Sequence, residues 1–163
     1  MNATHLHLLV NHFPVIGSII GVLIMAAGLL LRNEMIKKTA LVVFVGAGIF
    51  TGIAYKTGEE SEHAIESVPG FSEYYLEEHE ETAEGAAPFM YAMAAISLAS
   101  LVLIHKKHKR AKISTYLSMT LGIITMILMI QVGNLGGKIR RPDIRDNNQT
   151  PIENPSSEHE EEH

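Results

Sequence analysis

The chain has 163 residues and a formal net charge of −5, and 47% of its residues are hydrophobic. Its charged residues gather in short blocks between long uncharged runs, a pattern typical of membrane proteins rather than soluble ones. The chain has no cysteine, which excludes thiolate metal sites, disulfides and covalently attached c-type haem, so any cofactor must be held by His, Met, Tyr or carboxylate side chains.

Four uncharged runs predict four membrane-spanning helices. They cover residues 14–31, 39–55, 86–104 and 113–132. At about 1.5 Å of rise per residue, each run comes close to the roughly 30 Å hydrocarbon thickness of a bilayer. We therefore predict an all-α fold, with an integral membrane four-helix bundle in residues 1–138 and a polar, disordered tail in residues 139–163.

Two histidines, His7 and His12, precede the first apolar run. Asn11 is predicted to cap a helix that begins near His12, because Pro14 is tolerated in the first turn of a helix. This places His12 at the membrane surface and His7 outside the membrane. The partial positive charge of a helix N-terminus would keep His12 neutral and able to act as a ligand.

Basic residues in two connections predict how the helices are oriented. Three lie between the first and second runs and five between the third and fourth, so the positive-inside rule places both connections in the cytoplasm. Both termini and the loop 58–84 then lie outside the inner membrane. Four basic residues after the fourth run oppose this orientation but are outnumbered: Lys138, Arg140, Arg141 and Arg145.

The predicted outer loop, residues 58–84, contains ten glutamates and neither Lys nor Arg. Residues 59–67 and 73–84 are predicted to be helical, with a turn at 68–70 and Ser72 as a cap. The second of these helices is expected to run on into the third span, where Gly85 and Pro88 allow a bend. The acidic surface is interpreted either as a solvated face or as a docking site for a basic soluble electron carrier.

Glycines four residues apart recur in two of the predicted spans and directly after the fourth. In lipid, this spacing allows helix backbones to approach closely, so we interpret these residues as helix-packing positions. Small residues also leave flat space that a planar macrocycle needs. The pairs are Gly17 and Gly21, Gly48 and Gly52, and Gly133 and Gly137.

The predicted topology brings His7, His12 and His79 to the same outer side of the bundle. Haem b with two histidine ligands needs imidazoles from separate helices, which such a bundle supplies. His79 lies about 10 Å above the apolar edge and His12 about 3 Å, so His7 matches His79 better in height. His7 and His12 are separated by about 140° around a regular helix and would not share one face. The alternative is that these histidines only bond loop carbonyls or lipid headgroups.

A weaker metal-site hypothesis involves Glu60 and His63. Their Glu-x-x-His spacing is used twice in di-iron carboxylate bundles, but it occurs once here, on a segment expected to be exposed. A site for divalent metals could combine Glu60, His63 and His79.

Three segments resemble a family of small bacterial membrane proteins, domain of unknown function two-two-three-one. They are His7-Leu-Leu-Val-Asn-His-Phe-Pro14, the loop from Thr57 through Val68-Pro-Gly-Phe-Ser-Glu73 to His79, and Gly133-Asn-Leu-Gly-Gly-Lys-Ile-Arg140. The resemblance covers about residues 5 to 145 and implies a four-helix membrane protein in a redox setting. It singles out His7, His12 and His79, whereas Arg141 stands where another histidine would be expected.

From these observations we expect an inner-membrane protein that binds haem b near its outer face and transfers electrons. The alternative hypotheses are a cofactor-free accessory or assembly subunit of a membrane complex, and a metal-binding membrane protein. The sequence has no nucleophile elbow, phosphate loop or pair of carboxylates within a span, so we expect no catalytic activity of its own. The expected partners are the lipid bilayer, a basic soluble carrier and other membrane subunits, and no nucleic acid.

Overall fold

The computed structural model describes residues 3–61 and 69–145, and all regular secondary structure within them is helical. Four segments of this described part are long and apolar enough to cross a membrane: Thr4–Leu30, Glu34–Glu59, Glu73–His105 and Ala111–Lys138. This confirms the predicted helical class and the four apolar helices. The elements are α1 (Ala3–Val10), α2 (His12–Leu30), α3 (Glu34–Glu59), α5 (Glu73–His105), α6 (Ala111–Lys138) and the 3-10 helix η1 (Pro142–Ile144).

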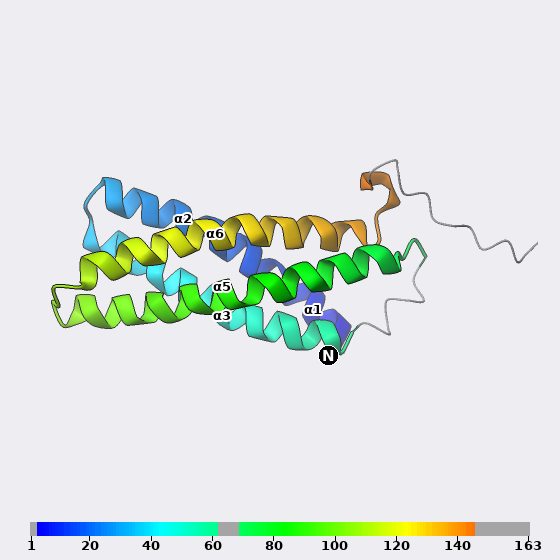
Figure 1. Ribbon diagram of the computed structural model, residues 1–163, viewed down its shortest axis with the longest axis horizontal. Coiled ribbons are helices and arrows are strands. Elements are labelled where there is room, and N and C mark those ends of the chain that lie inside the picture. Colours follow the sequence, from blue (N-terminus) through cyan, green and yellow to red (C-terminus); the bar gives the residue numbers. More distant parts are fainter. Residues whose placement is uncertain (1–2, 62–68, 146–163) are drawn as a thin grey trace, which may run out of the picture.

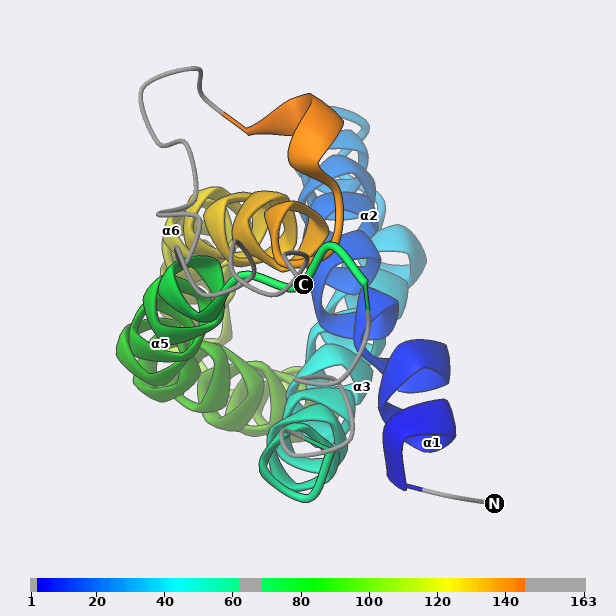
Figure 2. The same ribbon diagram turned by 90° about the vertical axis from the view of Figure 1, so that its right-hand side faces the viewer.

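The four long helices lie side by side, each packed against two neighbours (Figures 1 and 2). Helix α2 packs against α3 and α6, and α5 packs against α6 and α3. The connections 31–33 and 106–110 lie together at one end, on the left of Figure 1, which we call the basic end. The opposite end, where His7 and His79 lie, is called the histidine end.

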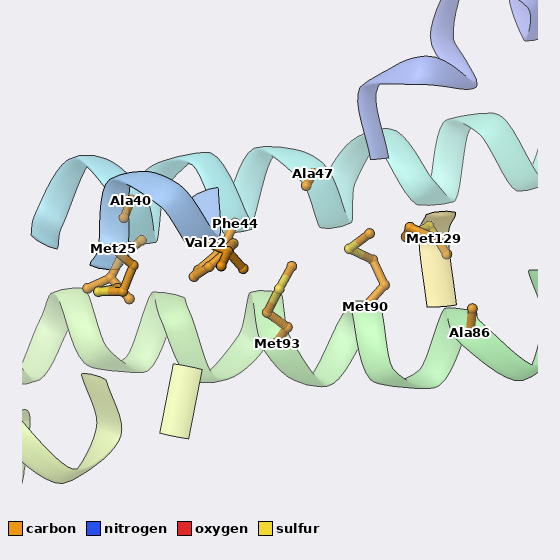
Figure 3. Packing of buried hydrophobic residues seen from close by; sticks show 10 residues of the cluster. Val22, Met25, Ala40, Phe44, Ala47, Ala86, Met90, Met93 and Met129 are labelled. Carbon is orange, nitrogen blue, oxygen red and sulfur yellow. The ribbon is translucent and has the colours of Figure 1, made fainter. Parts of the chain in front are cut away.

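Phe44 of α3 lies at the centre of the buried core, and its side chain is fully buried (Figure 3). Its ring lies against Gly21 of α2 and Gly122 of α6, where an added Cβ would collide with ring atoms. Methionines fill much of the remaining core, in keeping with a flexible side chain that fits irregular gaps. They are Met25, Met90, Met93 and Met129.

The predicted glycine positions lie at several different contacts. Two of them let helices approach closely: Gly17 faces Ala47 of α3, and Gly48 faces Ala94 of α5. A third, Gly21, faces the Phe44 ring, as described above. The remaining three have ordinary van der Waals surroundings: Gly52 lies near the Tyr91 hydroxyl, Gly133 near Val15 of α2, and Gly137 near Ile144.

A short helix, α1, precedes the predicted first helix. Asn11 holds the N-cap position of α2, which begins at His12 as predicted, but its backbone angles are helical and its side chain does not make the expected capping hydrogen bond. Its N–H instead donates to the His7 carbonyl at 2.9 Å. Pro14 has no N–H to offer the Val10 carbonyl, which explains why α1 and α2 separate at this point. Helix α1 therefore leaves the line of α2 and packs on α3 (Figure 2).

The acidic segment 73–84 continues into the third apolar run, as predicted. Helix α5 contains Pro88 without interruption. Ser72 holds the N-cap position, although its side chain makes no capping bond. The other predicted loop helix, residues 59–67, lies mostly outside the described residues, and α3 ends at Glu59.

The start of the predicted disordered tail differs from expectation, because residues 139–145 fold back on the histidine end. Arg145 donates from Nη2 to the carbonyl oxygens of Gly70 at 2.6 Å and Ile139 at 2.8 Å. Its Nε donates to the Lys138 carbonyl at 2.8 Å. The guanidinium also lies 5.5 Å from the centre of the Tyr75 ring. Residues 146–163 lie outside the described residues.

Candidate functional site

His7 is held against α3 by a hydrogen bond from its imidazole ring. Its Nδ1 lies 2.9 Å from the carbonyl oxygen of Ala54, and the Thr57 hydroxyl lies 3.4 Å from the same nitrogen. Because a carbonyl oxygen can only accept, Nδ1 carries the proton of this bond. A neutral ring in this tautomer keeps its lone pair on Nε2, where a metal could bind.

His79 is held against α6 in the same way. Its Nδ1 lies 2.9 Å from the carbonyl oxygen of Val132, so the neutral ring again keeps its lone pair on Nε2. Both histidines are partly buried. His7 lies on α1, ahead of the hairpin α2–α3, and His79 lies on α5, the first helix of the hairpin α5–α6. Each bonds to the backbone of the second helix of that hairpin.

A glycine lies beside each imidazole, one helical turn after the carbonyl that accepts its proton. Gly58 follows Ala54 by four residues, and a Cβ added there would lie 3.2 Å from Cε1 of His7. Gly136 follows Val132 by four residues, and its added Cβ would lie 3.1 Å from Cε1 of His79. The absence of a side chain at these two positions allows the rings to lie close to α3 and α6.

The sequence reasoning missed Gly58 and Gly136. It assigned glycines to helix packing from their four-residue spacing, and neither of these two belongs to such a pair. The signal that could have found them is a glycine near the end of α3 and another near the end of α6, both at the level of the predicted outer histidines.

His7 and His79 lie at the same end of the molecule, and each is bonded to its own neighbouring helix. His12, five residues after His7 in the sequence, is exposed. Asn11 lies between them in the sequence, and its side-chain oxygen is buried without a hydrogen-bond partner among the described residues. Of the three predicted histidines, the structure therefore gives His7 and His79 matching environments and leaves His12 outside them.

The described residues provide no support for the weaker metal-site hypothesis. Glu60 is exposed, and His63 lies outside the described residues. Within residues 3–61 and 69–145, no three His, Asp or Glu side chains come close enough together to hold a metal ion. A haem iron differs from such an ion in its needs, because the porphyrin supplies four nitrogens and the protein only the axial ligands.

Charged side chains surround the histidine end. Glu77, Glu81 and Glu84 of α5 are exposed, and the Glu84 carboxylate accepts a hydrogen bond from the Tyr55 hydroxyl at 3.3 Å. Basic residues from the end of α6 and the folded tail lie at the same end. Arg141 is exposed and forms an ion pair with Asp143 at 2.8 Å, which holds the pKa of the Asp143 carboxyl below its usual value.

No protein-family model matches this chain, and no curated protein or solved structure matches it either. The family resemblance noted in the sequence therefore stays a prediction. Function is inferred below from the residues and their geometry.

Proposed function

We propose that this chain is an integral inner-membrane four-helix bundle that holds haem b between His7 and His79 and transfers electrons. Its membrane placement is supported by four helices of sufficient length and apolarity. Large apolar side chains are also exposed on the outer faces of these helices, among them Leu23, Val42 and Ile127. In a monomer in water such exposure would be unfavourable, whereas lipid tails accept it. The basic connections support an orientation with both termini outside the cytoplasm.

The observation that carries the proposal is the matched anchoring of His7 and His79. Each donates its Nδ1 proton to a backbone carbonyl and keeps Nε2 available. Histidines that bind metals in proteins commonly have this second bond, which fixes the ring and makes the other nitrogen a better ligand. The two rings come from separate helices, α1 and α5, and both could serve as ligands of one bound haem iron.

His12 is not part of the proposed ligand pair. Its ring is exposed, and among the described residues it has no carbonyl anchor like those of His7 and His79. This choice agrees with the height difference expected from the sequence, which already favoured His7 as the partner of His79. The family resemblance, which includes all three histidines, is compatible with a different role for His12.

A haem site of this kind would allow the protein to transfer electrons. A bound haem b would provide a reversible one-electron centre, whose potential depends on its axial ligands and surroundings. The chain contributes the two imidazoles, their fixed orientation and partial exclusion of water. The exposed carboxylates of Glu77, Glu81 and Glu84 would attract a basic soluble carrier to this end.

A second candidate function is supported by the same hydrogen bonds. Histidines that only link helices would also donate Nδ1 protons to neighbouring backbones, as His7 does to α3 and His79 to α6. The chain would then be a cofactor-free accessory or assembly subunit. The two functions differ in what they require of Nε2, which only the haem function uses.

The visible spectrum of the purified protein, produced with adequate haem supply, tests the proposal. Two axial imidazoles make haem six-coordinate and low-spin, so the reduced protein should show sharp b-type absorption bands. His7→Ala and His79→Ala should each remove or convert these bands, and His12→Ala, the matched control, should keep them. Thermal melting must show that each variant is folded, since the void left by the imidazole can destabilise the site indirectly. A colourless, well-folded wild-type protein would refute the haem function in favour of the accessory-subunit function.

A further inference from the structure

A cleft of about 850 Å³ lies at the basic end, far from His7 and His79. Six cationic side chains and one carboxylate line this cleft. The rest of its lining is apolar or uncharged: Leu29, Ile104, His105, His108, Ala111, Thr115 and Tyr116. The one carboxylate, Glu34, is already paired with Lys38 at 2.9 Å. The cleft therefore has a strong excess of positive charge. Its cations are Arg32, Lys37, Lys38, Lys107, Lys109 and Lys112.

Two of these cations occupy backbone positions that favour glycine. Arg32 and Lys107 have φ values of 52° and 50°, in the left-handed region. Both follow a helix that ends in the same way: Asn33 N–H bonds to the Gly28 carbonyl, and His108 N–H to the Leu103 carbonyl. At this position of the motif glycine is the usual residue, because a Cβ is strained there. The chain instead places a long cation there twice, and both line the cleft.

The positive charge of the cleft comes from its side chains rather than from the helix dipoles. Helices α3 and α6 begin at this end, but α2 and α5 end here, so the partial charges of their termini largely cancel. The Asn33 side chain caps α3 by accepting from Met35 N at 2.9 Å and Ile36 N at 3.2 Å. At α6 the N-cap residue is Arg110, which gives no side-chain capping bond and adds another cation near the cleft.

Apolar surface at the same level indicates a ligand that also has an apolar part. Leu30, Leu31, Met35 and Ile113 are between 69% and 83% exposed beside the cleft. A free phosphate would use only the cations, whereas a phospholipid would place its phosphate among them and its acyl chains along this apolar surface. Basic pockets between membrane helices bind anionic headgroups in this way.

We propose that this cleft binds the phosphate headgroup of an anionic phospholipid from the leaflet at the basic end. This inference rests on the membrane placement in the proposed function but not on haem. Lipid binding is measured without reference to colour, so the two proposals fail separately. A colourless protein that selects anionic lipid would support the lipid site and refute the haem function. A haem protein without lipid selectivity would refute only the lipid site.

The test measures thermal stabilisation and lipid retention in neutral detergent supplemented with phosphatidylglycerol, phosphatidylcholine or inorganic phosphate. Wild-type protein should be stabilised by phosphatidylglycerol only. The double variant Arg32→Gly, Lys107→Gly should melt higher than wild type without lipid, because its backbone strain is relieved. It should nevertheless bind phosphatidylglycerol about 30-fold more weakly, because each cation near an anionic surface raises the affinity roughly fivefold.

The matched control is Lys56→Gln, Arg140→Gln, which removes the same charge from exposed positions at the histidine end and should leave lipid selectivity unchanged. If the glycine variant does not fold, Lys109→Gln, Lys112→Gln provides the same comparison at the start of α6. Equal loss in the cleft and control variants would mean a net-charge effect and overturn the site. Equal stabilisation by phosphatidylcholine, or full stabilisation by inorganic phosphate, would overturn the anionic lipid as ligand.

Discussion

Replacing Gly136 by alanine should separate the anchoring of His79 from the stability of the fold. The new Cβ would lie 3.1 Å from Cε1 and 3.3 Å from Nδ1 of the imidazole, so the ring must shift by a few tenths of an ångström. This shift strains the 2.9 Å bond to the Val132 carbonyl, whose net contribution is about 0.5–1.5 kcal/mol. Alanine is favoured over glycine in a helix by about 0.8–1 kcal/mol. The two effects nearly cancel, so the free energy of unfolding should change by less than about 1 kcal/mol.

The effect on the proposed cofactor should be much larger. Loss of a bond that orients a metal-binding histidine typically lowers affinity about 10- to 100-fold. We therefore expect Gly136→Ala to lose haem in a titration against a competing haem-binding protein, while its melting temperature stays close to that of wild type.

Gly133→Ala is the matched control on the same helix. Its new Cβ would make an ordinary contact, 3.6 Å from the Val15 side chain, so haem affinity should be unchanged and stability slightly raised. Equal haem affinity in wild type, Gly133→Ala and Gly136→Ala would refute the reasoning that the ring position of His79 governs cofactor binding.

Three further predictions concern other parts of the chain. A reporter enzyme active only in the cytoplasm, fused after His163, should be inactive; activity would reverse the proposed orientation. Glu77→Gln, Glu81→Gln should slow association with a basic electron carrier at low salt more than it speeds dissociation, whereas Glu34→Gln at the basic end should not; equal rates would leave the acidic surface a solvated face. Arg145→Ala should destabilise the folded tail by about 1–2 kcal/mol, because three hydrogen bonds from a charged group are lost, and faster amide exchange at 139–145 would report it. Arg141→Ala, which removes only an exposed ion pair, should have a smaller effect.

The four apolar helices could be predicted because lipid imposes a simple rule on composition: charge must be absent for about 17 residues or more. The ends of the helices were predicted less accurately. Helix α5 begins at Glu73 because glutamates form helix readily in water, beyond the limit set by the apolar run. Asn11 has the residue type of a cap, but its backbone is helical, since the residues before it form α1.

The candidate site was predictable only in part. The predicted topology placed His7 and His79 at one end of the bundle, and the helical rise placed them at similar height. These two predictions need only the order of the helices and the residue numbers. Their partners are backbone carbonyls of other helices, and every residue has such a carbonyl. The choice of Ala54 and Val132 depends on how the helices are shifted along each other, which is decided by side-chain packing in three dimensions. The contacts of Arg145 depend on packing in the same way.

The two helical hairpins, α2–α3 and α5–α6, are related by an approximate two-fold axis that runs along the helices. Exchanging α2 with α5 and α3 with α6 reproduces the observed set of neighbouring helices. The same exchange relates the Ala54 carbonyl of α3, which His7 bonds, to the Val132 carbonyl of α6, which His79 bonds, and it relates Arg32 to Lys107 at the other end. His7 itself lies on α1, whereas His79 lies on the continuous helix α5. A ligand lying on such an axis meets equivalent groups from both hairpins. Two copies of one hairpin, packed together, could therefore form a comparable four-helix arrangement.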